Sequence, residues 1–323
     1  MTLHEKILIL GGGMIGQKLA QKIIRENTFG AADITLFDRA FPVGDLGLKA
    51  ITGNIADPTL AAKLLVDKPD YIFQLASIVS GQAEQEFDLG WDVNMMPMWY
   101  LLNALKDLNE ASDGAYVPRV VFTSSIAVFG GPYPDKIGDE FLSAPQTSYG
   151  AQKAACELML SDFSRKGFMD GVSLRLPTIC VRPGKANKAA SSFFSGIIRE
   201  PLNGIEAILP VADTVCHWHA SPRSAAGFLT QAAFWDTDKL DGRSALNLPG
   251  YSCTVEEQIE ALRRAAGQEA VDLIKPVPDE AIIAMVKGWP RNFAPERAIK
   301  LGFTSEASFD EIISAYIEDD LKR

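Results

Sequence analysis

The sequence predicts an α/β fold in which a doubly wound parallel sheet is joined to a smaller C-terminal lobe. In the first half of the chain, short apolar segments alternate with stretches of helix-forming composition, as expected when crossover helices connect parallel strands. A glycine-rich turn joins the first apolar segment to the first helical stretch. From about residue 179 the alternation stops, and prolines and glycines separate short segments. We therefore expect one domain over residues 1–178 and a lobe over residues 179–323, with some of the lobe's segments returning to the first domain.

Composition restricts the class of protein. Of 323 residues, 47% are hydrophobic and 22% are charged, which is ordinary for a soluble globular chain. The formal net charge of −10 argues against nucleic-acid or anionic-membrane partners. No apolar run approaches the ~20 residues that cross a bilayer, and the first residues show no signal-peptide pattern. The cysteines are far apart with no CxxC pair, which predicts reduced thiols in a cytoplasmic protein: Cys156, Cys180, Cys216 and Cys253.

The glycine-rich turn predicts a dinucleotide site. Residues 6–10 (KILIL) form a buried strand, GGGMIG follows, and a helical pattern continues to about residue 25. Such a turn lets a pyrophosphate approach the backbone at a helix N-terminus. A glycine pattern alone is weak, but the strand before it and the helix after it strengthen the prediction. The expected cofactor contacts in this turn are Gly11, Gly13, Met14, Ile15 and Gly16.

The next strand bears on the choice of cofactor. Residues 33–37 form that strand, which ends in Asp38, roughly 20 residues beyond the last glycine. An acid at this place hydrogen-bonds the adenosine ribose and repels a 2′-phosphate, which favours NAD, although Arg39 keeps NADP open. A third strand over residues 48–53 precedes a loop that we expect near adenine through Asn54 and Ile55. Pro58 is expected to begin the following helix.

A fourth strand leads towards the centre of the site. Residues 71–75 end in Leu75 and Ala76, expected at the cofactor, and the chain then reaches Ser80, expected at the substrate. A long helix is predicted over residues 86–109. It contains Asn94, which is either a capped or solvent-facing amide or a polar anchor beneath the active site.

A fifth strand and the helix after it predict proton-transfer chemistry. Residues 119–123 form the strand, which delivers Ser125 at its carboxyl end, where ligands bind in open α/β sheets. On a helix over residues 146–166, Tyr149 and Lys153 are four residues apart and share a face. A tyrosine is a poor base because its pKa is near ~10, but a neighbouring ammonium lowers that pKa. The serine can hold a substrate oxygen while the tyrosine exchanges a proton. Tyr-x-x-x-Lys alone is common by chance, whereas its combination with the glycine turn favours a catalytic site.

Together these motifs resemble the extended short-chain dehydrogenase/reductases, the NAD-dependent epimerase/dehydratase family. The resemblance implies a Rossmann sheet, a catalytic Ser125, Tyr149 as acid/base and Lys153 as the residue that binds the nicotinamide ribose. It also implies a homodimer. The remaining contacts that we expect with the cofactor are Asn94, Ser124 and Pro177. Two departures stand out: Gln74 replaces a frequent histidine, and either Leu10 or Gly11 occupies the first position of the glycine turn.

Longer segments are similar to D-erythronate dehydrogenases, among them LASIVSGQAEQEFDLG, VVFTSSIAVFGGP and LRLPTICVRPGKANKAASSFF. This similarity implies NAD-dependent oxidation of the C2 hydroxyl of a four-carbon sugar acid to the 2-oxo acid. A nucleotide-sugar epimerase or dehydratase is the first alternative, disfavoured because residues 177–180 (PTIC) lack the usual asparagine. A non-catalytic NAD(P)-sensing protein is the second, disfavoured because Ser125, Tyr149 and Lys153 are intact.

The C-terminal half should contribute the substrate-binding lobe. A carboxylate substrate calls for a guanidinium, and the candidates are Arg182 and Arg223, each of which would otherwise form an ion pair. Candidate neutral partners are Thr178, Ser80 and Ser221, each of which would otherwise cap a loop. The CHWH run at residues 216–219 places two histidines on one strand face, but without a third ligand it predicts no metal. We expect packing there, with one histidine as a candidate substrate contact.

Overall fold

The computed structural model describes residues 4–41, 47–184 and 190–321. Residues 185–189 lie outside this description; they belong to the segment LRLPTICVRPGKANKAASSFF, which was compared above with D-erythronate dehydrogenases. The main sheet has seven strands in the order β11-β7-β5-β4-β1-β2-β3, and every pairing is parallel. This confirms the predicted doubly wound α/β fold. The strands are β1 (Glu5–Leu10), β2 (Ala32–Asp38), β3 (Lys49–Thr52), β4 (Tyr71–Gln74), β5 (Arg119–Ser125), β7 (Asp170–Leu176) and β11 (Ala245–Asn247).

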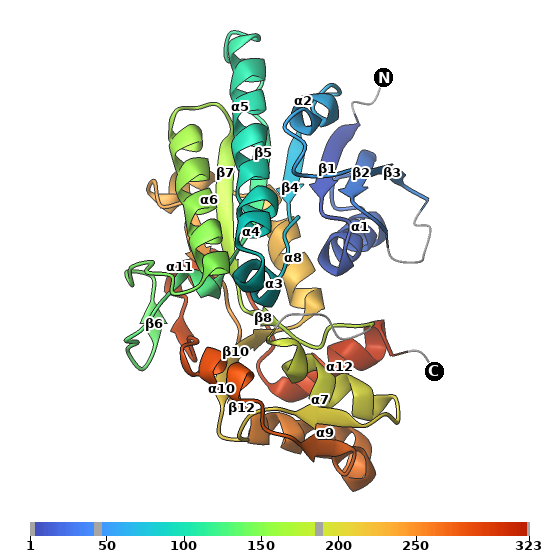
Figure 1. Ribbon diagram of the computed structural model, residues 1–323. Helices are drawn as coiled ribbons and strands as arrows, with labels where there is room; N and C mark the ends of the chain where they lie inside the picture. Colours follow the sequence, from blue (N-terminus) through green and yellow to red (C-terminus); the bar gives the residue numbers. More distant parts are fainter. Residues whose placement is uncertain (1–3, 42–46, 185–189, 322–323) are drawn as a thin grey trace.

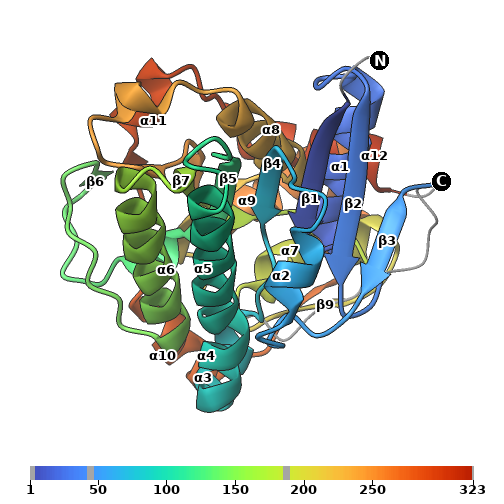
Figure 2. The same ribbon diagram turned by 90° about the horizontal axis from the view of Figure 1, so that it is seen from above.

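Alternating side chains of the strands bury both faces of the sheet. In β1, Ile7 and Ile9 face the core that includes α1 and α8, whereas Leu8 and Leu10 face the core of α5 and α6. Figure 2 shows these two pairs of helices on opposite sides of the sheet. The helices associated with the sheet are α1 (Met14–Glu26), α2 (Leu60–Leu64), α3 (Ser80–Gln85), α4 (Phe87–Asn94), α5 (Met96–Glu110), α6 (Ser148–Arg165) and α8 (Pro222–Ala233).

Two predicted helix boundaries are wrong. The single helix expected over residues 86–109 is two helices, α4 and α5, separated at Met95. Pro97 lies in the first turn of α5, where its missing N–H is harmless, but its ring would clash with the carbonyl four residues earlier in a continuous helix. Pro58 also does not begin its helix, because α2 starts two residues later, after Thr59.

A second core lies below the carboxyl ends of the main strands (Figure 1). It is formed by α7 (Ser192–Leu202), α9 (Val255–Val271) and α12 (Phe309–Asp319), which bury Phe194, Leu262 and Ile312 among others. Three small sheets pair β8 (Thr178–Ile179) with β10 (Cys216–Ala220) and β12 (Tyr251–Thr254), β9 (Ala207–Leu209) with β13 (Ile274–Pro276), and β6 (Ile137–Gly138) with β14 (Phe293–Ala294). The remaining helices are α10 (Glu280–Lys287), α11 (Glu296–Lys300) and the short 3-10 turns Ile126–Val128 and Thr237–Leu240.

Later segments of the chain return to the main sheet. β11 pairs with β7 at its edge, and α8 packs beside α1 on one face. The chain therefore leaves the main sheet after β7, forms α7 of the second core, and returns to the sheet at α8 and β11. None of the helices in the described ranges is both long enough and apolar enough to cross a bilayer.

Candidate active site

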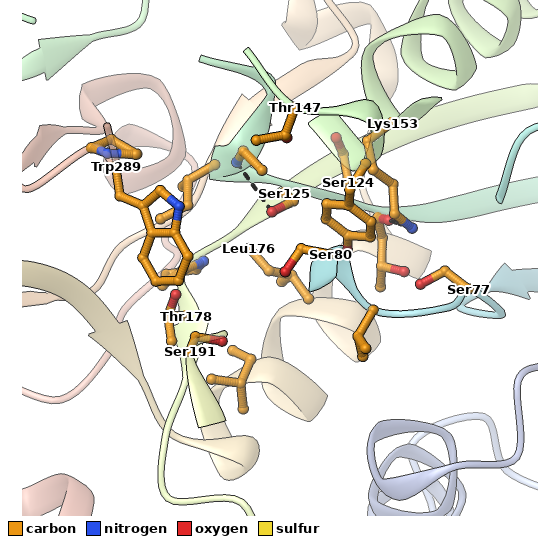
Figure 3. Close-up of a pocket in the computed structure, with 18 of the residues that line it drawn as sticks. Ser77, Ser80, Ser124, Ser125, Thr147, Lys153, Leu176, Thr178, Ser191 and Trp289 are labelled. Atoms are coloured by element: carbon orange, nitrogen blue, oxygen red, sulfur yellow. Dashed lines mark hydrogen bonds between the residues drawn. The ribbon is translucent and has the colours of Figure 1, made fainter. Parts of the chain in front are cut away.

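A cavity of about 630 Å³ lies at the carboxyl ends of the central strands, between the sheet and the second core. Parallel strands and their following loops converge there, as in other open α/β sheets. Figure 3 shows Lys153 and Ser77 on one side of this cavity and Thr178 and Trp289 on the other. Thirteen of the expected site residues line it: Gly13, Met14, Ile15, Gly16, Leu75, Ser80, Ser124, Ser125, Tyr149, Lys153, Pro177, Thr178 and Arg182.

The glycine turn packs too tightly for side chains at two positions. Gly11 has a φ of +111°, and a Cβ atom there would lie 2.7 Å from the nitrogen of Ala76. A Cβ atom on Gly16 would lie 2.0 Å from the carbonyl oxygen of Gly11. Gly11, not Leu10, therefore takes the first position of the turn. Gly11 and Ala76 were both expected to contact the cofactor directly, but neither lines the cavity. What the structure shows for both is that they shape the turn.

The N-terminus of α1 fits a pyrophosphate. Its first residues line the cavity, its N-cap Gly13 provides no side-chain hydrogen bond, and its first turn contains no acid. A Cβ atom on Gly13 would meet no atom within 4 Å, so this side of the turn is open. Unpaired N–H groups and the helix dipole favour an anion at such an end. The turn thus has the donors and the space that a nicotinamide dinucleotide needs.

The expected adenosine contacts lie outside the cavity. Asp38 ends β2 beside the turn: its Cβ would be 3.4 Å from a Cβ atom on Gly12, and its carboxylate accepts from the backbone nitrogen of Arg39 at 2.6 Å. Asn54 accepts from the nitrogen of Ala56 and closes its own loop, while Ile55 packs against the sheet core. Asp38 therefore keeps a position suited to a ribose, whereas the other two side chains have structural contacts.

The three expected catalytic residues come together in the cavity. Ser125 is the last residue of β5, and its hydroxyl oxygen accepts from the nitrogen of Ala127 at 3.1 Å. Tyr149 and Lys153 lie one turn apart on α6, with the Lys153 nitrogen 5.6 Å from the centre of the tyrosine ring. In the part of the chain that the structure describes, no hydrogen bond occupies the Tyr149 hydroxyl, which leaves it free for a ligand.

Contacts with β5 hold the side chain of Lys153 in place. Its side chain is 1% exposed, and its ammonium donates to the carbonyl oxygen of Thr123 at 2.9 Å and lies 4.8 Å from the centre of the Phe122 ring. No carboxylate among the described residues pairs with it. One proton is thus committed to β5, and the other two remain available to a ligand and to the electrostatic support of Tyr149.

A buried ion pair fixes this helix against two strands. Glu157, one turn beyond Lys153 on α6, pairs with Arg175 of β7 at 2.7 Å and accepts from the hydroxyl of Ser124. The hydroxyl of Ser124 is therefore committed to Glu157, although the residue lines the cavity. Glu157 was not among the expected site residues, because nothing in the sequence shows that a charged residue on a helix is buried at the end of a strand.

Asn94 does not line the cavity, which corrects its expected contact with the cofactor. Its buried amide accepts from the nitrogen of Ile78 at 2.7 Å and donates to the side chain of Gln152 at 2.7 Å. Both ends of the amide are thereby used inside the protein. Asn94 anchors the loop that carries Ser77 and Ser80 to α6, so its role is that of a polar anchor.

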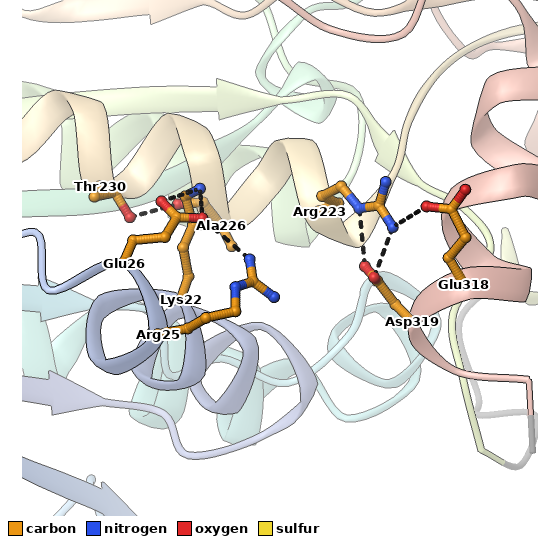
Figure 4. Close-up of polar contacts among 8 residues, drawn as sticks. All are labelled: Lys22, Arg25, Glu26, Arg223, Ala226, Thr230, Glu318 and Asp319. Atoms are coloured by element: carbon orange, nitrogen blue, oxygen red, sulfur yellow. Dashed lines mark hydrogen bonds and ion pairs between the residues drawn. The ribbon is translucent and has the colours of Figure 1, made fainter.

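The two candidate arginines are in different environments. Arg182 lines the cavity and donates to the carbonyl oxygen of Ile179 at 2.8 Å and to the hydroxyl of Ser191 at 3.0 Å. Burial lowers the pKa of its guanidinium, and no described carboxylate pairs with it. Arg223 instead binds Asp319 at 2.6 Å and Glu318 at 2.8 Å between α8 and α12, outside the cavity (Figure 4). This corrects the expectation for Arg223, because its charge is already neutralised there.

Part of the wall opposite the catalytic residues comes from a segment that carried no motif. Met285 and Trp289 reach the cavity from the end of α10 and the residues after it, whereas His217 reaches it from the CHWH run of β10. Such apolar and aromatic residues are indistinguishable from core residues in the sequence. Within the described ranges, no group of three or more His, Cys, Asp and Glu residues is arranged to hold a metal ion.

His217 has two hydrogen bonds and His219 a separate one. The ring nitrogens of His217 lie 2.7 Å from the hydroxyl of Thr178 and 2.8 Å from the carbonyl oxygen of Pro290. Burial lowers the pKa of His217 to about 4, so the ring is neutral at pH 7. His219 does not line the cavity and instead contacts Gln258 at 2.9 Å. Only His217 is therefore a candidate for substrate recognition.

Comparison with known proteins agrees with this geometry. Residues 7–221 match the NAD dependent epimerase/dehydratase family. The chain is 44% identical to a D-erythronate dehydrogenase of Cupriavidus necator, over 97% of this chain and 98% of that protein. It is 38% identical to a D-erythronate dehydrogenase of Haemophilus influenzae, over 98% and 100%.

Solved structures give the same result for the fold. A structure described as a nucleoside-diphosphate-sugar epimerase from Agrobacterium tumefaciens is 51% identical, with a TM-score of 0.93 and coverage of 98% of this chain and 94% of that one. An L-threonine dehydrogenase from Clostridium difficile, at 23% identity, has a TM-score of 0.85 over 98% of both chains and supports the fold alone. The chain belongs to the NAD dependent epimerase/dehydratase family.

Proposed function

We propose that this protein oxidises the C2 hydroxyl of a small sugar acid, D-erythronate or a close analogue, to the 2-oxo acid with a nicotinamide cofactor. The observation that carries the proposal is one cavity that holds Ser125, Tyr149, Lys153 and Arg182 next to the glycine turn, with no carboxylate of the described residues paired to Arg182. The two D-erythronate dehydrogenases that match nearly the full chain support the same substrate class.

Each residue has a distinct role in the proposed reaction. Tyr149, as phenolate, takes the proton of the C2 hydroxyl, and Ser125 holds the same oxygen through a hydrogen bond. The ammonium of Lys153 stabilises the phenolate and binds a ribose hydroxyl of the cofactor. A nicotinamide cofactor held at the glycine turn would supply the acceptor for the hydride that leaves C2 as the carbonyl forms. Arg182 binds the carboxylate and thereby sets the position of C2 relative to Tyr149.

We propose NAD as the preferred cofactor. Asp38 ends β2 beside the glycine turn, where its carboxylate suits ribose hydroxyls and repels a 2′-phosphate. Arg39 is exposed next to it and is the feature that keeps NADP as the alternative.

The direct test is an assay of the purified protein with a panel of four-carbon acids. We expect D-erythronate and NAD⁺ to produce NADH, measured by its absorbance, and NADP⁺ to give a lower kcat/KM. Absence of turnover with every acid of the panel would contradict the substrate proposal, and equal use of both cofactors would contradict the role of Asp38.

A nucleotide-sugar epimerase is the second candidate, because the 51% identical structure carries that name. An epimerase regenerates its cofactor, so it would convert a nucleotide sugar without net formation of NADH. The Arg182 guanidinium, which has no carboxylate partner in the described part of the chain, suits a carboxylate or a diphosphate and so does not separate the two candidates. The same assay, run with nucleotide sugars and analysed for isomerised product, separates the two candidates.

We propose a homodimer formed through the outer faces of α4, α5 and α6, where Phe87, Trp99 and Leu158 are exposed. Figures 1 and 2 show α5 and α6 side by side on the surface of the sheet. Burying such apolar side chains stabilises an interface.

Light scattering should give twice the chain mass of 35.1 kDa, and Leu158→Glu should reduce the measured mass to that of one chain. Val66→Glu is the matched control, because Val66 is equally exposed, at 74% against 73%, but lies outside these helices. A monomeric wild type would refute the proposal.

We also propose a reducing compartment such as the cytoplasm. The four cysteines form no disulfide with each other, and burial raises the pKa of Cys156 and Cys180 to about 12, which makes both thiols poorly reactive. Counting free thiols in protein isolated under non-reducing conditions tests this, with four expected and fewer contradicting it.

A further inference from the structure

Thr178 and His217 form a hydrogen-bonded pair in the cavity wall opposite the catalytic tyrosine. The Thr178 hydroxyl lies 2.7 Å from Nε2 of His217, and Thr178 is half-buried and lines the cavity. The histidine ring is held on both sides, stacked on Phe194 at 5.3 Å between centroids and in contact with Trp289 at 5.2 Å. The ring is therefore fixed in one orientation.

The partner of the other ring nitrogen decides where the protons are. Nδ1 of His217 lies 2.8 Å from the carbonyl oxygen of Pro290, which can only accept a hydrogen bond. Nδ1 must therefore carry the proton, since a lone pair there would face the lone pairs of the carbonyl oxygen. A neutral ring with a proton on Nδ1 has a lone pair on Nε2. The Thr178 hydroxyl then has to donate to Nε2.

This arrangement determines what Thr178 can offer to a ligand. Its one proton is committed to His217, so only the lone pairs of its oxygen remain for the cavity. A hydroxyl that can only accept forms a hydrogen bond with a ligand O–H or N–H group. Opposite an ether oxygen or a methylene of the ligand it forms none. Arg182 in the same cavity presents only donors, so the two side chains recognise opposite kinds of group.

We propose that His217 is a positioning residue that makes Thr178 an obligatory hydrogen-bond acceptor, so that the substrate must carry a hydroxyl besides the one oxidised at C2. The inference rests on the proposed function and narrows it: the substrate class is a polyhydroxy acid, and 2-hydroxy acids with an unsubstituted tail are rejected. A site built around a substrate hydroxyl discriminates strongly against analogues that lack it, because its own polar group is then left unpaired.

The test compares kcat/KM for D-erythronate and for 2-hydroxybutanoate of the same C2 configuration, which keeps the carboxylate and lacks the other hydroxyls. We expect the wild type to prefer D-erythronate by at least about 10²-fold. Thr178→Val, which keeps the shape and removes the oxygen, should reduce this preference by at least about 10-fold, mainly through slower use of D-erythronate. Thr178→Ser, the matched control, should keep the preference. His217→Phe should lower the preference as well, since it frees the Thr178 proton.

An independent measurement reports on the pair without activity. The chain has only three histidines, so ¹⁵N-labelled histidine gives a simple NMR spectrum in which the tautomer of His217 can be assigned. We expect the proton on Nδ1. A proton on Nε2, or an unchanged preference in Thr178→Val, would overturn the inference while leaving the dehydrogenase function intact. A wild type that oxidises neither acid would overturn the proposed function and the substrate requirement together, whatever the tautomer.

Discussion

Tyr149→Phe is expected to lower kcat about 10²- to 10⁴-fold, the range typical of losing a positioned acid or base. The phenylalanine ring can keep its place above Lys153, so the change removes the oxygen and little else. Stopped-flow or steady-state NADH formation with saturating D-erythronate measures the loss. Because the variant keeps the glycine turn and Lys153, its affinity for NADH, measured by fluorescence, should stay close to that of the wild type.

Tyr133→Phe is the matched control for this prediction. The Tyr133 hydroxyl is within hydrogen-bond distance of two carbonyl oxygens, those of Phe129 and Gly288, and donates its one proton to them. Tyr133 does not line the cavity. Its loss should leave kcat within a factor of a few, although one internal hydrogen bond is lost. If Tyr149→Phe retained more than about a tenth of wild-type kcat, proton transfer by this residue would be refuted.

Arg182→Leu is expected to lower kcat/KM for the sugar acid by about 10²-fold, chiefly through KM, since a charge-assisted hydrogen bond contributes about 1.5–3 kcal/mol. The guanidinium lies in the cavity wall and has no carboxylate partner among the described residues. Arg182→Lys should be intermediate, because it retains the charge and loses the planar fork. The measurement is a series of initial rates against acid concentration at fixed, saturating NAD⁺.

Arg223→Leu provides the comparison that decides between the two arginines. It removes a partly exposed ion pair between α8 and α12, which contributes little to stability and lies away from the cavity. Its kcat/KM should equal that of the wild type. A large loss in Arg223→Leu together with normal kinetics in Arg182→Leu would reverse the assignment of the carboxylate site.

Much of the catalytic half was predictable because its signals are local. The strands bury side chains on both faces, as Ile7 and Leu8 show, so each one appears in the sequence as a short continuous apolar run that can be recognised without knowledge of its partners. Tyr149 and Lys153 share a helix face by spacing alone. The break between α4 and α5 was also encoded locally, at Pro97, but its meaning was missed because a proline in a first turn and a proline that ends a helix look alike.

The sequence by itself determined the α/β class, the glycine turn and the residues proposed to move the proton, because each depends on neighbours within about one turn or one strand. Only the tertiary structure decided that the Asn94 amide hydrogen-bonds Ile78 and Gln152 and that His217 orients Thr178. It also decided that carboxylates neutralise Arg223, whereas none of the described residues does so for Arg182. These are questions of which groups satisfy each other's charge and hydrogen bonds. Their answers join positions such as 178 and 217, which the chain brings together only when β8 pairs with β10.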